Sequence, residues 1–136
     1  MVLSDTMSEP KCIADRILLY MRHTLDYVHD PRNARIQYEW DEHIEPFETE
    51  VRAMADEIYR EYVRGDEDII NGQNPKALAA AIVYIAGICK GPGIGKVGIT
   101  QKMITEALDI NRNGLKRQYL RLRNMRMQFF DLPRWN

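Results

Sequence analysis

An uninterrupted apolar segment at residues 77–89 constrains the fold of this chain more than any other feature of its sequence. Asn74 and Pro75 precede it, and these residue types favour the cap and the first turn of a helix. Thirteen apolar residues are too few to cross a bilayer, so no membrane segment is expected. A helix without a polar face must be surrounded by other helices. We therefore expect a buried central helix at about 74–90.

The remaining pattern predicts an all-α, single-domain protein over residues 1–136. Apolar residues recur at helical spacing in four further segments. The five expected helices span about 10–28, 46–64, 74–90, 100–109 and 111–127. The first is expected to begin near Pro10, and the second near Pro46, because a proline in the first turn of a helix lacks only an N–H that would be unbonded anyway. Residues 30–45 are then a long connection between the first two helices.

The last two expected helices form a helix-turn-helix pattern at residues 100–123. Thr100 and Asn111 are expected to cap them, with a short turn between. On the last helix, Leu115, Tyr119, Leu122 and Phe129 are predicted to face the core. In this motif the second helix places its N-terminal turns in the major groove of DNA. The residues predicted to contact DNA bases or phosphates are Lys102, Arg112, Asn113, Lys116, Arg117, Arg121 and Arg123.

Charge is distributed unevenly along the chain. Residues 1–70 have a net charge of −9 and residues 71–136 a net charge of +8, which gives −1 for the whole chain. A basic half is typical of a protein that binds a polyanion such as double-stranded DNA. The alternative interpretation is internal pairing of the acidic half with the basic half.

The order of helices resembles one repeat of the cyclin fold, as found in the core domain of transcription factor IIB and its archaeal counterpart. In that family the central helix reads like Ala-Ala-Ala-x-x-Tyr-x-Ala, which residues 79–86 match. The family's next helix, Thr-Gln-(Lys/Arg)-x-x-(Ile/Val), is similar to residues 100–104 except at Met103, and its last helix resembles residues 115–122. The clear resemblance covers residues 46–123.

This resemblance implies a transcription-associated, DNA-binding protein. It also implies the TATA-binding protein or RNA polymerase as partners, and pairing of two cyclin folds, here in a homodimer or with another cyclin-fold protein. The chain departs from the family in having one repeat and too few cysteines for a zinc ribbon, and Gln73 replaces the usual arginine of the turn before the central helix. A single-repeat relative therefore fits better than a complete initiation factor.

Catalytic, metal and cofactor sites have no support in the sequence, and we expect neither an enzyme nor a metal or cofactor. The three histidines, His23, His29 and His43, are expected at the surface. Cys12 and Cys89 are expected to be buried free thiols in a cytoplasmic protein, nucleoid-associated in a prokaryote. The glycine-rich segment 91–98 follows a helix, whereas a phosphate-binding fingerprint follows a strand. It is therefore expected to be a loop.

Two functions remain open at this point. The first is DNA binding through residues 100–123. The second is a cyclin-type adaptor that binds a partner protein in the groove beside the central helix, without DNA.

Overall fold

The computed structural model describes residues 10–30, 40–90 and 99–135, and all regular elements in these ranges are helical. The α-helices are α1 (Ile13–Val28), α2 (Trp40–Ile58), α3 (Glu67–Ile70), α4 (Pro75–Cys89), α5 (Gln101–Leu108) and α6 (Arg112–Met125). A π-helical segment, η2 (Tyr59–Val63), continues α2, and a 3-10 turn, η3 (Gln128–Phe130), follows α6. The all-α prediction is confirmed for this part of the chain, with six α-helices in place of five.

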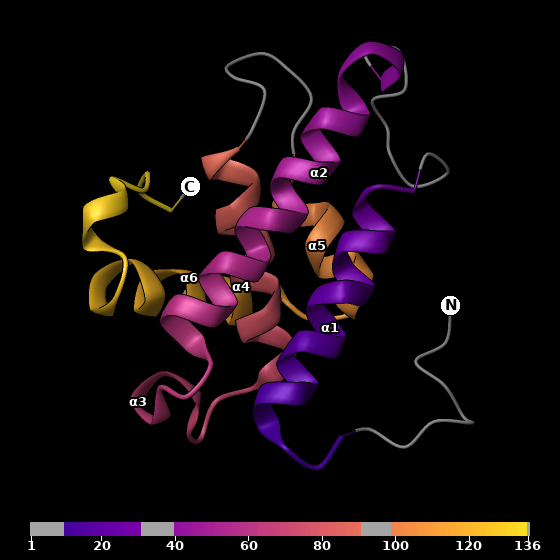
Figure 1. The fold of residues 1–136 in the computed structure, drawn as a ribbon. Helices are drawn as coiled ribbons and strands as arrows, with labels where there is room; N and C mark the ends of the chain where they lie inside the picture. Colours follow the sequence, from indigo (N-terminus) through magenta and orange to yellow (C-terminus); the bar gives the residue numbers. More distant parts are fainter. Residues whose placement is uncertain (1–9, 31–39, 91–98, 136) are drawn as a thin grey trace.

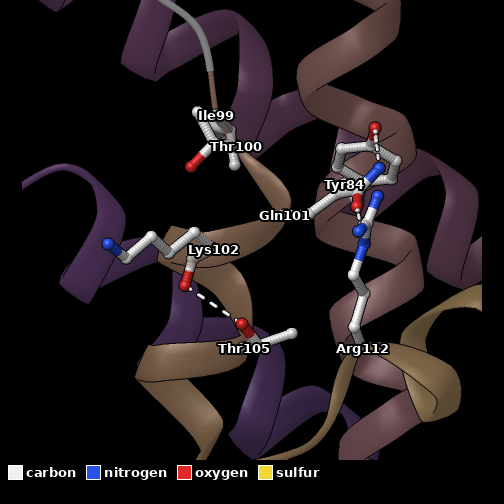
Figure 2. A pocket seen from close by; sticks show the side chains of 7 residues that line it. All are labelled: Tyr84, Ile99, Thr100, Gln101, Lys102, Thr105 and Arg112. Atoms are coloured by element: carbon white, nitrogen blue, oxygen red, sulfur yellow. Dashed lines mark hydrogen bonds between the residues drawn. The ribbon is translucent and has the colours of Figure 1, made fainter. Parts of the chain in front are cut away.

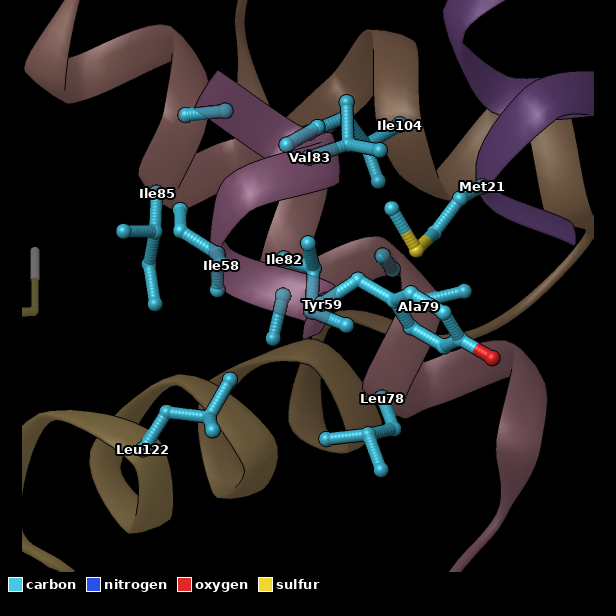
Figure 3. Packing of buried hydrophobic residues seen from close by; sticks show 14 of the residues in the cluster. Met21, Ile58, Tyr59, Leu78, Ala79, Ile82, Val83, Ile85, Ile104 and Leu122 are labelled. Carbon is cyan, nitrogen blue, oxygen red and sulfur yellow. The ribbon is translucent and has the colours of Figure 1, made fainter. Parts of the chain in front are cut away.

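Helix α4 is the centre of the fold, and α1, α2, α5 and α6 all pack against it (Figure 1). Every residue from 77 to 83 is buried, as expected for a helix without a polar face. Its first turn is fixed by Asn74, whose Oδ1 accepts hydrogen bonds from the backbone N–H groups of Lys76 (2.9 Å) and Ala77 (3.3 Å). Figure 3 shows Leu78 and Ile82 of this helix among apolar side chains from its neighbours. The predicted central helix is thus confirmed.

Two predicted helix starts are wrong. Helix α1 begins at Ile13, after an extended Cys12, and not near Pro10. Helix α2 begins at Trp40, so the connection is shorter than the predicted 30–45. Proline is frequent in the first turn of helices but does not by itself mark where a helix begins. Pro46 lies in the second turn of α2, where a proline costs the helix one hydrogen bond but does not end it.

Helix α3 lies between the second and third expected helices, in a segment where no helix was predicted. Asp66 caps it, since its Oδ1 accepts hydrogen bonds from the backbone N–H groups of Asp68 (3.1 Å) and Ile69 (3.4 Å). The same carboxylate forms an ion pair with Arg126, with a distance of 2.5 Å between Nε and Oδ2. The hydrogen bond from Arg126 holds the pKa of Asp66 below its usual value. This pair joins α3 to the end of α6.

The chain after α6 departs from the predicted core pattern. Phe129 was expected to face the core, yet 98% of its surface is exposed. The α-helix ends at Met125 and the chain continues into η3, so helical spacing no longer determines which residues point inward. Met127 and Leu132 are buried instead.

Candidate nucleic-acid interface

Helices α5 and α6 are joined by the short turn 109–111, and a polar side chain caps each of them. Thr100 Oγ1 accepts a hydrogen bond from the N–H of Met103 (3.1 Å), and Asn111 Oδ1 accepts one from the N–H of Gly114 (2.8 Å). Asp109 takes the left-handed conformation with φ 51°, which aspartate tolerates better than most residues. The expected caps and turn are therefore present.

The inner faces of both helices are buried in the domain core. Met103, Ile104 and Leu108 of α5 and Leu115 and Leu122 of α6 are all buried. The packing leaves the opposite faces in solvent. Of the predicted contact residues, the structure places Lys102, Arg112, Asn113, Lys116 and Arg117 at exposed positions.

Lys116 and Arg117 are exposed cations on α6. Neither side chain forms an ion pair or hydrogen bond with any residue that the structure describes. Helix α6 as a whole carries five basic residues and no acidic residue. Its N-terminal end also bears the positive end of the helix dipole. An anion that approaches this helix therefore meets positive charge along its length.

Arg121 and Arg123 are bound to the protein's own backbone. Arg121 donates from Nη2 to the carbonyl oxygen of Asp68 (2.9 Å) and from Nη1 to that of Ile69 (3.1 Å), near the C-terminal end of α3. Burial, followed by the charge of Arg117, lowers the pKa of Arg121. Arg123 donates from Nε to the carbonyl oxygen of Leu132 (3.2 Å). These two predicted DNA contacts thus also have structural roles.

A cavity of about 660 Å³ lies beside the N-terminal ends of α5 and α6 (Figure 2). Its lining residues come from α4, α5, α6 and the segment before α5, and they are Tyr84, Ile99, Thr100, Gln101, Lys102, Thr105 and Arg112. Gln101 is central to one wall, because its Nε2 donates to the Tyr84 hydroxyl (3.1 Å) and its Oε1 accepts from Arg112 Nε (2.5 Å). Among the described residues that line the cavity, two are cations and none is acidic, which favours an anionic ligand.

The sequence left open that the acidic half (1–70) pairs internally with the basic half (71–136). The ion pairs of the structure support this alternative only in part. Arg126 joins the halves through its ion pairs with Asp66 and Asp68. Arg52, however, pairs with Asp26 and Glu48 inside the acidic half. Lys116 and Arg117 take no part in such pairs within the described residues.

The histidine prediction is wrong for His29, which is only 6% exposed. Its Nδ1 lies 2.7 Å from the carbonyl oxygen of Leu25, and burial lowers its pKa. His29 follows the buried Leu25 by four positions, so it continues the buried face of α1 one residue past the end of the helix. His23 is half-buried, with Nε2 3.0 Å from the carbonyl oxygen of Ala107. The side chain of His43 lies outside the described residues.

The cysteine prediction holds in part. Both thiols are free, but Cys12 is exposed and Cys89 is half-buried. Cys12 was expected to be buried, and it is exposed because it precedes α1 instead of lying inside it. Among the described residues, no group of three or more potential metal ligands is found, and no helix is long and apolar enough to cross a membrane. The glycine-rich segment 91–98 lies outside the described residues.

Three polar or aromatic residues at this site escaped the sequence analysis: Tyr84, Gln101 and Trp135. Gln101 belongs to the Thr-Gln-Lys pattern, which predicted a helix start and a family resemblance but no role for this side chain. Trp135 lies in the C-terminal tail, for which no role was predicted. Comparisons with protein-family models, curated proteins and solved structures give no match for this chain.

Proposed function

We propose that this protein is a DNA-binding, transcription-associated domain of one cyclin-like repeat, in which α5 and α6 act as a helix-turn-helix. The observation that supports this best is the exposed pair Lys116 and Arg117 on a helix that has no acidic residue. Solvated lysines and arginines are common on protein surfaces. Helix α6, in contrast, has five basic residues and no acidic residue, and it is capped and packed on the domain core. A basic helix of this kind is typical of nucleic-acid binding.

The proposed binding mode divides the exposed residues by chemistry. Helix α6 enters the major groove with its N-terminal turns, where Arg112 and Arg117 can pair with guanine and Asn113 with adenine. Lys102 and Lys116 bind backbone phosphates and release counterions. Arg121 and Arg123 hold α6 to α3 and to the tail, and contact phosphate only from the edge of the interface.

The partners follow from the same resemblance. The TATA-binding protein or RNA polymerase would be contacted by surfaces other than α6, and a homodimer or a second cyclin-fold protein would supply the repeat that this chain lacks. The protein would act in the cytoplasm, bound to the nucleoid in a prokaryote. No catalytic activity, metal or cofactor is proposed.

The proposal is tested by a fluorescence-anisotropy titration of random-sequence duplex DNA at two salt concentrations. Lys116→Glu with Arg117→Glu should abolish binding at the higher salt. A matched control, Arg22→Glu with Arg60→Glu, makes the same charge change at exposed positions of α1 and η2 and should bind as the parent does. Equal binding by both double variants refutes the assignment of the interface to α6.

Base reading is tested separately with the single variant Arg117→Ala. If this residue reads a base, the loss is about 1–3 kcal/mol on the preferred sequence and smaller on others. If it contacts only phosphate, the loss is smaller and the same on all sequences.

A second candidate, the cyclin-type adaptor, is favoured by the cavity in Figure 2, which lies beside the central helix α4. There the partner would be a protein segment with an acidic side chain, because Lys102 and Arg112 line the cavity. This candidate replaces the first if the wild-type protein binds no DNA at low salt.

A further inference from the structure

The C-terminal tail, residues 131–135, is attached along α6 and reaches α4. Leu132 is buried, and its carbonyl oxygen accepts the hydrogen bond from Arg123. The Tyr119 hydroxyl donates a short hydrogen bond to the carbonyl oxygen of Pro133. Trp135 then packs against Tyr84 and Tyr119, with ring centroids 5.7 Å and 5.5 Å apart. Three successive contacts thus fix the position of the Trp135 ring.

The Trp135 ring closes a circle of side chains from four segments. The guanidinium carbon of Arg112 lies 5.7 Å from the centre of the Trp135 ring. Arg112 donates to Gln101, Gln101 donates to Tyr84, and Tyr84 packs edge-on against Trp135. The circle therefore connects α4, the first residue of α5, the first residue of α6 and the tail. We call these four residues (Tyr84, Gln101, Arg112 and Trp135) the tail clamp.

We propose that Trp135 is a positioning residue for nucleic-acid binding, because the tail clamp holds Arg112 and the first turns of α5 and α6 in the arrangement that contacts DNA. This inference rests on the function proposed above and adds the tail to that interface. Arg112 remains exposed while it is clamped.

The physical advantage of the clamp is preorganisation. An arginine side chain that is not held in place loses rotamer entropy when a ligand fixes it. A side chain that already lies on an aromatic ring loses less at that step. A cation–π contact at an exposed site is worth about 0.5–1 kcal/mol, which corresponds to a two- to fivefold change in affinity.

A double-mutant cycle on DNA affinity tests this inference. Trp135→Ala should weaken binding about two- to fivefold, and Trp135→Phe should recover part of the loss because it restores a ring. In an Arg112→Ala background, Trp135→Ala should have no further effect, since Trp135 acts through Arg112. The same loss in both backgrounds, or no loss in either, overturns the inference.

The clamp itself can be measured without DNA. Trp40→Phe leaves Trp135 as the only tryptophan, because the chain has two. In that background, Arg112→Ala or Gln101→Ala should increase acrylamide quenching of the Trp135 fluorescence. Arg117→Ala, a matched change on the same helix outside the clamp, should not.

The two measurements separate the two proposals. Failure of the wild-type protein to bind DNA at low salt refutes the proposed function, and the role of the clamp in binding with it. If the wild type binds DNA but acrylamide quenching is unchanged in both clamp variants, the proposed function is supported and the proposed role of the tail clamp is refuted.

Discussion

Ala81→Asp is the substitution that tests the central helix most severely. Ala81 is fully buried in α4, with apolar neighbours on the same helix. A fully buried carboxyl group commonly has its pKa raised by about 3 units or more, and a 3-unit shift costs about 4 kcal/mol at pH 7. Overpacking and the lower helix propensity of aspartate add about 1 kcal/mol or more. The expected loss is therefore about 5 kcal/mol, comparable to the total stability of many domains.

Thermal unfolding followed by circular dichroism measures this loss, which should appear as a decrease in Tm of about 10–20 °C or as an unfolded protein. Ala53→Asp makes the same change at an exposed position of α2 and should cost about 1 kcal/mol or less. The folded pKa of the new carboxyl group is raised above its unfolded value, so the destabilisation should shrink as the pH falls toward 4. If the Ala81→Asp protein melts like the parent, α4 is not the buried centre of the fold.

Three further outcomes are expected. Without reductant, the unfolded protein should show two free thiols; in the native state Cys12 should react faster with a disulfide reagent than Cys89, whose thiol pKa is raised by burial. Burial raises the pKa of Tyr119 to about 12, so in the unfolded state this group ionises first. The free energy of unfolding should therefore fall between pH 10 and 12, and Tyr119→Phe should flatten that fall; an equally steep fall in the variant contradicts the assignment. Gly87→Ala places a Cβ 3.1 Å from Ile99 Cβ. It should therefore give less than the ~1 kcal/mol of stabilisation expected from helix propensity, and an Ile99→Gly background, which removes that Cβ, should restore the gain in thermal melts.

The elements whose ends are marked by side-chain chemistry could be predicted from the sequence. Asn74, Thr100 and Asn111 each accept the backbone hydrogen bonds that their positions led us to expect. A cap is a local interaction between residues two or three positions apart, so a single sequence contains the information needed to place it. The burial of α4 followed equally directly, because a helix without a polar face must be surrounded by other helices.

The elements that depend on distant contacts could not be predicted. Helix α3 is four residues long, and its cap Asp66 is joined to Arg126, 60 residues away. A long apolar stripe is needed to recognise a helix by periodicity, and α3 has none. Phe129 was misplaced for a related reason, since the helical period was extended past the residue where the backbone leaves the helix.

The candidate site shows the same limit. Sequence reasoning identified a basic helix and listed its arginines and lysines together. The structure divides them, because Arg121 and Arg123 bind backbone carbonyl groups from α3 and the tail, whereas Lys116 and Arg117 remain exposed. The tail clamp could not be predicted either, since Trp135 meets Arg112 only through tertiary packing.

The salt dependence of DNA affinity tests the central claim most directly. Each phosphate neutralised on duplex DNA contributes about −0.9 to the slope of log K against log salt concentration. We predict a steep negative slope for the wild-type protein, and a slope shallower by about 0.9 for Lys116→Ala with Arg117→Ala, since the phosphate contact of Lys116 is then lost. An unchanged slope in that double variant, or no binding by the wild type at low salt, contradicts the claim that α6 binds DNA.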